Sequence, residues 1–400
     1  MAYSSIVRNT FHKIRLSTSL GKNLGTRSLA EVPLRHSSSN ATEQNESIIA
    51  IQEMHRFMKD CMLAVGCTET DSNQLAETLV HADHRGHYSH GLNRLDMYVE
   101  DVRCGATVSG IVEPIIIKET TSSASVDGNN LLGPVVGNFC MQLAIKKARE
   151  SGISLVVAKG SNHYGIAGHY SLQAVREGMI GISMTNTSPL VVPTRASECI
   201  LGTNPIAVGA PGLGDDCFVL DMATSAAALG KLELADRKSQ KIPIGWGADS
   251  TGQATEDPKE ALKGGLMPLG GIEYTSGYKG FGLAMLVEVL TGILSGGAYG
   301  PFVRKWKVRS KLADLGQMFM VINPNFFPDG FRERMQELMD FLRQANTAPD
   351  AKGNVLVAGD PERQNIAKCE RIGGIPYSQV QVDYANNLAK LLQIDQPKIL

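Results

Sequence analysis

The sequence has little cysteine and no excess of either charge. Seven cysteines are scattered over 400 residues without a CxxC motif, which excludes a disulfide-rich scaffold and indicates a reducing compartment. The 39 lysines and arginines balance 40 aspartates and glutamates, so a nucleic-acid partner is not expected. The longest apolar run, residues 281–294, is interrupted by Glu288 and is too short to cross a bilayer. We therefore predict a soluble intracellular protein with no membrane partner.

The usual nucleotide-binding signatures are also missing. No predicted strand leads into GxGxxG, and no GxxxxGK[ST] occurs, so the sequence predicts neither a Rossmann turn nor a P-loop. The nearest Gly-rich segment, residues 160–165, contains His163 and lacks the glycine order of a Rossmann turn. A dinucleotide, if one binds, must be held by another arrangement.

Residues 1–37 differ in composition from the rest of the chain. They contain six basic residues against one acid, Glu31, with frequent serine and threonine and a weakly amphipathic apolar pattern. This composition is typical of a mitochondrial transit peptide. Its removal would leave 33 basic and 39 acidic residues, a net charge near −6. We therefore predict a mitochondrial location; a disordered basic tail on a cytoplasmic protein is the alternative.

Hydrophobic periodicity separates a mainly helical N-terminal part from an α/β part. Apolar residues at helical spacing predict helices over 48–61 and 71–83, and Ser89 as an N-cap predicts a third over 89–103. Strands are predicted over 115–117, 124–128, 153–158, 180–185, 206–209, 218–221 and 317–322, and further helices over 135–150, 170–177, 226–236, 280–295, 330–345 and 380–392. This alternation indicates an α/β fold with a substantial sheet.

Four histidines recur every three residues, at positions 81, 84, 87 and 90. A metal site is one interpretation, but steps of three drift around a helix, so that His81 and His90 would face opposite ways. No HExxH motif occurs either. We therefore predict no metal and interpret most of these histidines as surface or cap residues.

His90 is the exception because Arg94 follows it by one predicted helical turn. With Ser89 as the cap, the two side chains share a face, and the helix N-terminus lowers the pKa of the histidine. A proton donor beside a carboxylate-binding guanidinium is what reduction of a 2-oxo acid requires. Ordinary structural roles for both residues are the alternative.

Polar turns adjoin several of the predicted strands. They lie at residues 161–164, 185–189, 202–205 and 221–225, and a further one at 277–282 opens the long apolar helix. Because polar residues beyond the carboxyl ends of strands line ligand crevices in α/β proteins, we predict that these turns share one site.

The motifs together resemble the type-2 malate/L-lactate dehydrogenase family over about residues 45–385. They are SHGLNR at 89–94, NH at 162–163, GTNP at 202–205, DMATS at 221–225, GK at 230–231 and GYKG at 277–280. The resemblance implies a non-Rossmann NAD(P)-binding α/β fold with a mixed sheet, and a homodimer. It divides the chain into an NAD(P)-binding domain, 121–345, and a mainly helical substrate and dimer domain, 45–120 with 346–400.

The same resemblance assigns the site residues. His90, His163 and Arg94 match catalytic positions, with either histidine as the proton donor, and Ser89, Arg94 and Thr187 match substrate-binding positions. Cofactor contacts fall on Asp221, Met222, Ala223, Tyr278, Lys279, Gly359 and Asp360. Family members often have Pro-Gly where this chain has Ala358-Gly359. No basic residue near these turns can be assigned to a 2′-phosphate, so the choice between NAD and NADP is not decided; the cofactor is NAD or NADP, with NAD favoured.

The implied activity is NAD(P)-dependent interconversion of a small 2-hydroxy acid and its 2-oxo acid. Malate and oxaloacetate are the default pair, and ureidoglycolate, sulfolactate or a cyclic imino acid are alternatives within the family. Two other classes are a non-catalytic nucleotide-binding relative and a metallohydrolase that uses the histidine run.

Overall fold

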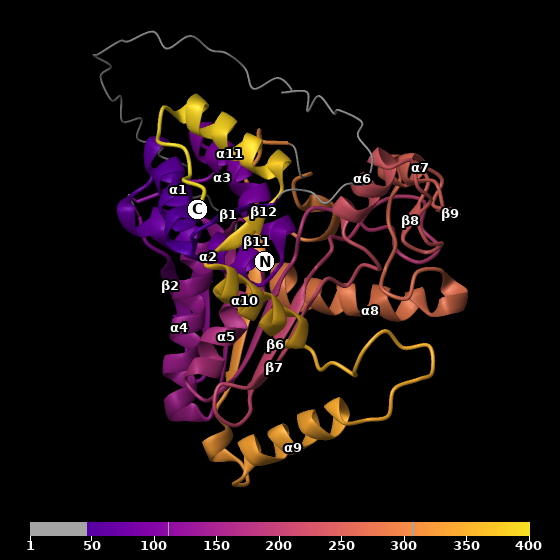
Figure 1. The fold of residues 1–400 in the computed structure, drawn as a ribbon. Coiled ribbons are helices and arrows are strands. Elements are labelled where there is room, and N and C mark those ends of the chain that lie inside the picture. The colour runs from indigo at the N-terminus through magenta and orange to yellow at the C-terminus, as the bar shows by residue number, and fades with distance from the viewer. Residues whose placement is uncertain (1–45, 111, 306–307) are drawn as a thin grey trace, which may run out of the picture. The chain divides into compact units, whose positions relative to one another are not determined.

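The computed structural model describes residues 46–400, except residue 111 and residues 306–307. The predicted transit peptide therefore lies outside the described residues. The described residues belong to one compact unit, drawn in Figure 1.

A seven-stranded mixed sheet is the centre of this unit. In spatial order its strands are β2 (Ile115–Glu119), β3 (Ser123–Asp127), β4 (Ile153–Ser161), β11 (Leu315–Ile322), β5 (Ile180–Thr185), β6 (Ile206–Pro211) and β7 (Cys217–Met222). Among these strands only β3 and β4 pair in parallel. Strand β11 lies between β4 and β5 and is antiparallel to both. With β6 antiparallel to both β5 and β7, the strands β3, β4, β5 and β7 all point the same way. The mixed sheet predicted from the sequence is confirmed.

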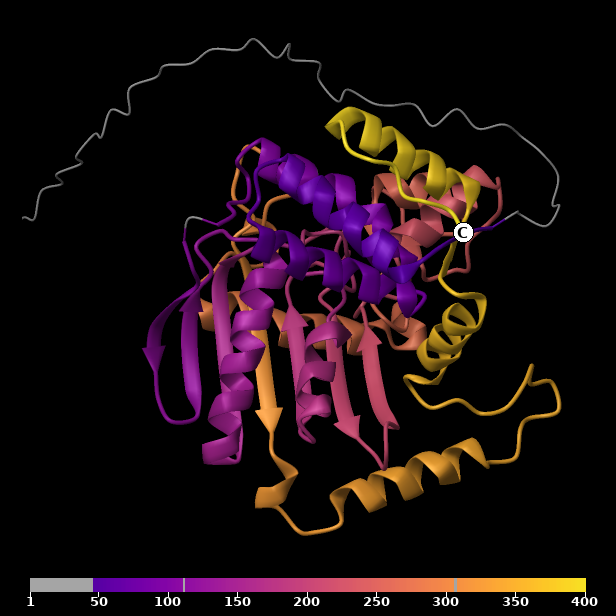
Figure 2. The same ribbon diagram turned by 60° about the vertical axis from the view of Figure 1, so that its left-hand side comes forward.

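Side-chain alternation gives the sheet two buried faces. In β4, Val156 and Ala158 pack against α4 (Gly133–Ser151) and α5 (Gly168–Arg176). Val157, between them, packs on the opposite face against Val287 of α8 (Gly277–Glu288). Figure 2 shows α4 and α5 in front of the sheet and α8 crossing behind it. The result is a helix–sheet–helix sandwich.

A second hydrophobic core joins the two ends of the described chain. It contains residues of α1 (Ile51–Ala64), α2 (Glu69–His84), α3 (Leu95–Arg103), α10 (Asp360–Ile372) and α11 (Gln379–Leu392). Strand β1 (Ser47–Ile49) pairs with β12 (Ile375–Tyr377) and ties the same ends together. Figure 2 places α1, α2 and α11 beyond the edge of the sheet to which β5 and β7 point.

The remaining elements lie outside these two cores. A small sheet of β10 (Gly265–Leu266), β8 (Gly247–Ala248) and β9 (Ala254–Thr255) packs with α6 (Leu229–Arg237) and α7 (Pro258–Lys263). Helix α9 (Phe331–Arg343) contacts the far ends of β6 and β7. The small sheet, α7 and α10 were not predicted, because two-residue strands carry no periodicity and α10 is largely polar.

The predicted third helix, 89–103, ends at Arg103 as expected, but its predicted start at Ser89 is wrong. The chain instead forms two short 3₁₀ turns, η1 (Tyr88–His90) and η2 (Leu92–Arg94), and α3 starts only at Leu95. Gly91 interrupts the helix with φ −103° and ψ −125°. It packs so tightly on Asp83 that a Cβ would lie 1.9 Å from the carboxylate. Tertiary contact with α2 therefore outweighs the Ser89 cap.

The long apolar helix predicted over 280–295 is also modified. It begins at Gly277, and at Val289–Ile293 the α-helix widens into a π-helical turn. Just before that turn, Glu288 is 2% exposed in the interior, where it binds the turns described below. A π-turn beside a buried polar group is common at functional sites.

Candidate active site

The polar turns meet at one edge of the sheet, as the sequence predicted. β4, β5 and β7 end at this edge, and the 202–205 turn enters β6 there because β6 runs the other way. Asn204 Oδ1 accepts a hydrogen bond from the Thr187 N–H at 3.1 Å. The Thr203 carbonyl accepts one from the Thr224 N–H at 2.8 Å. Three turns far apart in the sequence thus form one bonded surface.

The buried carboxylate of Glu288 binds two of these turns, 185–189 and 202–205. It accepts hydrogen bonds from Asn204 Nδ2 at 3.0 Å, Asn186 Nδ2 at 3.1 Å and the Gly300 N–H at 3.2 Å. A buried carboxylate with three donors rigidifies whatever it binds. Our sequence analysis noted Glu288 only as an interruption of the apolar run; a charge inside an apolar helix was the signal for this role.

His163, at the end of β4, lies between two aromatic neighbours. The His90 ring stacks on it, with centroids 5.8 Å apart and planes 19° apart. On its other side the Tyr98 hydroxyl lies 2.5 Å from His163 Nδ1. Ser89 Oγ is 2.9 Å from His90 Nδ1. The structure therefore brings together both predicted histidines and adds Tyr98, four residues after Arg94, which the sequence analysis did not select.

Burial keeps both imidazoles neutral. It lowers the pKa of His90 to about 4, with smaller contributions from the positive charges of Arg94 and His87. Burial also holds the pKa of His163 well below its usual value, assisted by His90 and Arg94. The predicted helix-terminus effect on His90 is wrong, because no helix begins at Ser89. Arg94 nevertheless lies close enough to act electrostatically on both rings.

Tyr98 can pair with His163 in either protonation state. The Gly165 N–H lies 3.3 Å from His163 Nδ1 and also reaches the Tyr98 oxygen. When Nδ1 lacks a proton, it accepts from Tyr98; when Nδ1 carries one, it donates to the hydroxyl, since a hydroxyl can do both. The arrangement suits a histidine that gains and loses a proton.

Asp83 fixes the turn that carries His90. Its Oδ2 accepts hydrogen bonds from the Leu92 N–H at 2.9 Å and from the Tyr377 hydroxyl at 2.7 Å. Burial raises the pKa of this fully buried carboxyl to about 7. The His90 turn is thus anchored to α2 and, through Tyr377, to the C-terminal part of the chain.

The predicted cofactor residues form two groups. Asp221, Met222 and Ala223 lie half-buried at the end of β7, and the Asp221 carboxylate accepts a hydrogen bond from the Gly168 N–H at 2.8 Å. Burial raises the pKa of Asp221. Tyr278 and Lys279 are exposed in the first turn of α8. Leu269 joins the two groups: its N–H donates to the Thr224 carbonyl at 2.8 Å, and Gly280 packs on its backbone.

Gly359 and Asp360 lie further along the edge strand β7. The Val219 N–H donates to the Ala358 carbonyl at 3.0 Å, and Gly359 adopts φ +102°, a conformation that favours glycine. Asp360 binds Arg343 at 2.8 Å and Arg363 at 2.5 Å. Its carboxylate is thus engaged in a local ion-pair network.

Polar groups without partners mark where a ligand fits. Ser161 Oγ, Asn162 Oδ1 and Gln317 Oε1 are buried and have no hydrogen-bond partner within the described part of the chain. All three lie on β4, β11 or the turn after β4, next to His163. Buried polar atoms are rarely left unpaired, so a polar ligand at this edge fits the residues present.

The other histidines of the run lie in the last turn of α2 and in the segment after it. His81, His84 and His87 are all half-buried. His81 Nδ1 lies 2.9 Å from His169 Nδ1, and His87 Nε2 lies 3.3 Å from Glu362 Oε1. Among the residues that the structure describes, no three His, Cys, Asp or Glu side chains are grouped so that they could hold a metal ion.

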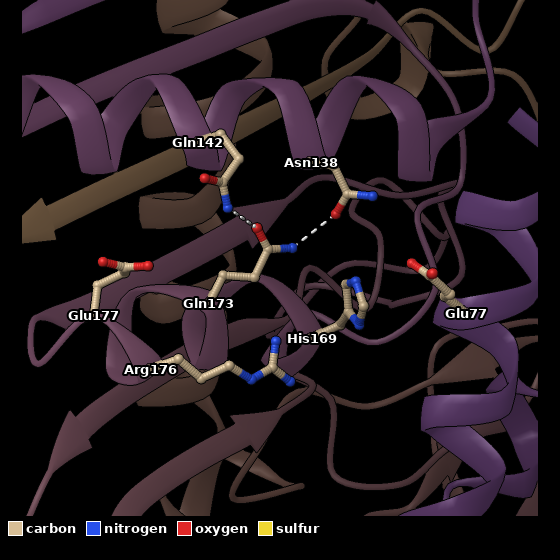
Figure 3. Close-up of a pocket in the computed structure, with 7 residues that line it drawn as sticks. All are labelled: Glu77, Asn138, Gln142, His169, Gln173, Arg176 and Glu177. Atoms are coloured by element: carbon tan, nitrogen blue, oxygen red, sulfur yellow. Dashed lines mark hydrogen bonds between the residues drawn. The ribbon is translucent and has the colours of Figure 1, made fainter. Parts of the chain in front are cut away.

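Two hollows of about 330 and 530 Å³ lie away from this site, beside α2 and α5. Figure 3 shows the smaller one, where Gln173 bonds to Gln142 and Asn138 and His169 lies between Arg176 and Glu77. Neither hollow contains a predicted site residue.

Comparison with known proteins identifies the family. The family model described as "Malate/L-lactate dehydrogenase" matches residues 49–385. The chain belongs to the malate/L-lactate dehydrogenase family. It is 40% identical to the malate dehydrogenase of Pyrococcus abyssi over 352 residues, which cover 87% of this chain and 96% of that protein.

Other members of the malate/L-lactate dehydrogenase family are similar over most of their length. A malate/(S)-sulfolactate dehydrogenase of Methanothermus fervidus is 38% identical, covering 87% of this chain and 99% of that protein. The structure of the malate dehydrogenase of Pyrococcus horikoshii OT3 superposes with a TM-score of 0.81 at 36% identity, covering 90% and 99% of the two chains. The protein is therefore an oxidoreductase that acts on CH–OH groups. No described helix combines the length and apolar character needed to cross a membrane.

Proposed function

We propose that this protein interconverts malate and oxaloacetate with NAD as the hydride carrier. The observation that carries the proposal is the stack of His90 on His163, with Tyr98 bonded to His163 and Arg94 beside both rings. Similarity to proteins named malate dehydrogenases supports malate over other 2-hydroxy acids. NAD is preferred because no cation is assigned to a 2′-phosphate.

The substrate's own groups match the residues around this stack. The C1 carboxylate binds the Arg94 guanidinium, whose planar fork suits a carboxylate. The C2 hydroxyl lies against His163, and Thr187 and Ser89 complete the polar wall. His90 covers the other face of the imidazole and excludes water. This placement orients C2 for reaction.

The proton and the hydride leave malate in opposite directions. The hydroxyl proton passes to Nε2 of the His163 imidazole, in the tautomer whose Nδ1–H donates to the Tyr98 hydroxyl. The electron pair of the C2–H bond leaves as hydride, for which NAD is the acceptor when bound. Asp221, Met222, Ala223, Tyr278 and Lys279 would hold the cofactor, with the Gly359 and Asp360 segment at its periphery. Reduction of oxaloacetate runs the same steps in reverse.

A substrate panel tests the proposal. The purified protein without residues 1–37 is given NADH or NADPH with oxaloacetate, pyruvate, 3-sulfopyruvate and a cyclic imine, and loss of the reduced nicotinamide absorbance is followed. Fastest turnover of oxaloacetate with NADH supports it. Faster turnover of another substrate would support the same class of reaction but would reject malate as the substrate. Treatment with a metal chelator should leave the rate unchanged.

We also propose that the protein is a homodimer that uses the outer face of α8. Leu286 of α8, Val289 and Ile293 of the π-helical turn, and Leu294 directly after that turn are 43–50% exposed, and Phe302 is 71% exposed. Exposed apolar patches of this kind mark protein interfaces. Light scattering of the wild type and of Ile293→Asp tests this, because the variant should be monomeric.

The mitochondrial location is proposed from the composition of residues 1–37. Fusion of this segment to a fluorescent protein should direct it to mitochondria. Replacement of its six basic residues by glutamine should abolish that targeting.

A further inference from the structure

One carboxylate in the helical part holds two guanidinium groups. Asp101 of α3 is 7% exposed. Its Oδ2 accepts a hydrogen bond from Arg304 Nη2 at 2.6 Å, and its Oδ1 accepts one from Arg309 Nε at 2.9 Å. Two positive charges on one negative charge leave a net positive charge at this position.

The two arginines are not equivalent. Arg304 is nearly buried, with a side chain 9% exposed, and also donates Nη1 to the Lys311 carbonyl at 3.3 Å. Arg309 is 39% exposed and uses only Nε. Its two terminal amino groups have no partner within the described ranges. Arg309 therefore has donors left for an anion, while Asp101 fixes the base of the guanidinium.

Both ends of this cluster are attached to the candidate active site. Tyr98 and Asp101 lie three residues apart in α3 and therefore on one side of that helix, and Arg94 immediately precedes the helix. Burial chiefly raises the pKa of Tyr98, and the charge of Asp101 adds to the increase. On the sheet side, the Arg304 carbonyl accepts a hydrogen bond from Ser188 Oγ at 2.8 Å, directly after Thr187.

A four-carbon diacid carries its two anionic groups at opposite ends. The terminal carboxyl carbons of malate are joined by three C–C bonds and lie about 4 Å apart when extended. When the C1 carboxylate binds Arg94, the second carboxylate therefore needs a separate cation. Arg309 is a cation with uncommitted donors, and its partner Asp101 belongs to the helix that follows Arg94 directly.

We infer that Arg309, oriented by Asp101, binds the second anionic group of the substrate and thereby selects diacids over monoacids. The inference rests on the proposed function and refines it, because it assigns a residue to substrate choice. A ureido or alkyl tail carries no negative charge that could pair with the guanidinium. Malate and a sulfonate analogue would both satisfy it, since each carries a second negative charge.

Paired substrates of equal chain length test this role. We compare oxaloacetate with 2-oxobutyrate in the wild type, Arg309→Gln and Arg309→Lys. For Arg309→Gln we expect kcat/KM for oxaloacetate to fall about 10- to 100-fold, mainly through KM, as for a lost charged hydrogen bond. The value for 2-oxobutyrate should stay within about twofold. Arg309→Lys should recover part of the loss, and Arg149→Gln, an exposed arginine on α4, is the control.

A binding assay separates this inference from the proposed function. Calorimetry of malate and lactate in the presence of NADH, with which neither hydroxy acid can react, measures substrate choice without turnover. Weaker malate binding and unchanged lactate binding in Arg309→Gln support the inference even if turnover is slow. Equal losses for both ligands, or no loss for malate, overturn it. Wild-type protein that turns over only monoacids or imines rejects malate as the substrate as well, whereas normal oxaloacetate turnover in Arg309→Gln rejects Arg309 alone.

Discussion

Tyr98→Phe isolates the contribution of one hydroxyl to proton transfer. The Tyr98 side chain is 3% exposed, so the phenylalanine ring fills the same space and no solvent replaces the lost group. The change removes the contact with His163 Nδ1 and leaves only the Gly165 N–H at 3.3 Å. A backbone N–H can only donate, so it cannot stabilise a protonated Nδ1.

The expected decrease in kcat follows from the different hydrogen-bonding needs of the neutral and the protonated imidazole. In the reactive tautomer the Nδ1–H loses its acceptor, and this loss costs more in the imidazolium formed during the reaction, where the hydrogen bond is charge-assisted. A hydrogen bond to a charged group contributes about 1.5–3 kcal/mol, which corresponds to a roughly 10- to 100-fold decrease in kcat. The ground state changes little, so KM for the acid should stay within about twofold. Tm should fall slightly, because one buried hydrogen bond is lost.

Steady-state kinetics over a range of pH are the assay. Tyr98→Phe should lower the apparent pKa of the catalytic base in the kcat profile. Tyr88→Phe, which removes a hydroxyl from the turn before His90, is the matched control and should leave the profile unchanged. If Tyr98→Phe lowers Tm but leaves kcat and its pH dependence intact, Tyr98 is only structural and the assignment of His163 is wrong.

Three further predictions concern charged and titratable side chains. Arg94→Gln should raise KM for the acid substrate at least about 10-fold while the affinity for NADH stays the same; a selective loss of NADH affinity would contradict the clamp. His163→Gln should reduce kcat by about 10²-fold or more and His90→Gln by less, and the reverse order would make His90 the acid/base. Folding stability should fall as the pH drops from about 6.5 toward 4, because burial lowers the pKa of His169 to about 4 while the unfolded chain binds the proton at about 6.5. This histidine alone accounts for a loss of about 3 kcal/mol at most. Urea unfolding at several pH values measures the loss, and His169→Gln should make the stability depend less on pH.

The sheet and the edge that carries the site were predictable from the sequence. Runs such as 180–185 are apolar, β-rich and bounded by polar turns, and β5 has those bounds in the structure. The direction of each strand was harder to predict, because β11, which lies between β4 and β5 in the sheet, comes much later in the sequence. The polar turns still meet, since the turn before the reversed strand β6 lies at the same edge as the turns after β5 and β7.

The local geometry around His90 was not predictable. Ser89 followed by a helical pattern is a good N-cap signal, but the contact of Gly91 with Asp83 is a tertiary interaction between residues whose packing no periodicity reveals. The same holds for Tyr98 and Arg309. Their roles depend on partners, His163 and Asp101, that are distant in sequence and become neighbours only through the fold.

The electrostatics of the site link substrate binding to proton transfer. In the free protein, burial and the positive charge of Arg94 keep His90 and His163 neutral, which is the form that accepts a proton from a hydroxyl group. A carboxylate bound at Arg94 cancels that charge, so it raises the pKa of both imidazoles. A second anionic group at Arg309 acts in the same direction. The substrate that fits both arginines is therefore also the one that best stabilises the imidazolium formed when its own hydroxyl proton is removed.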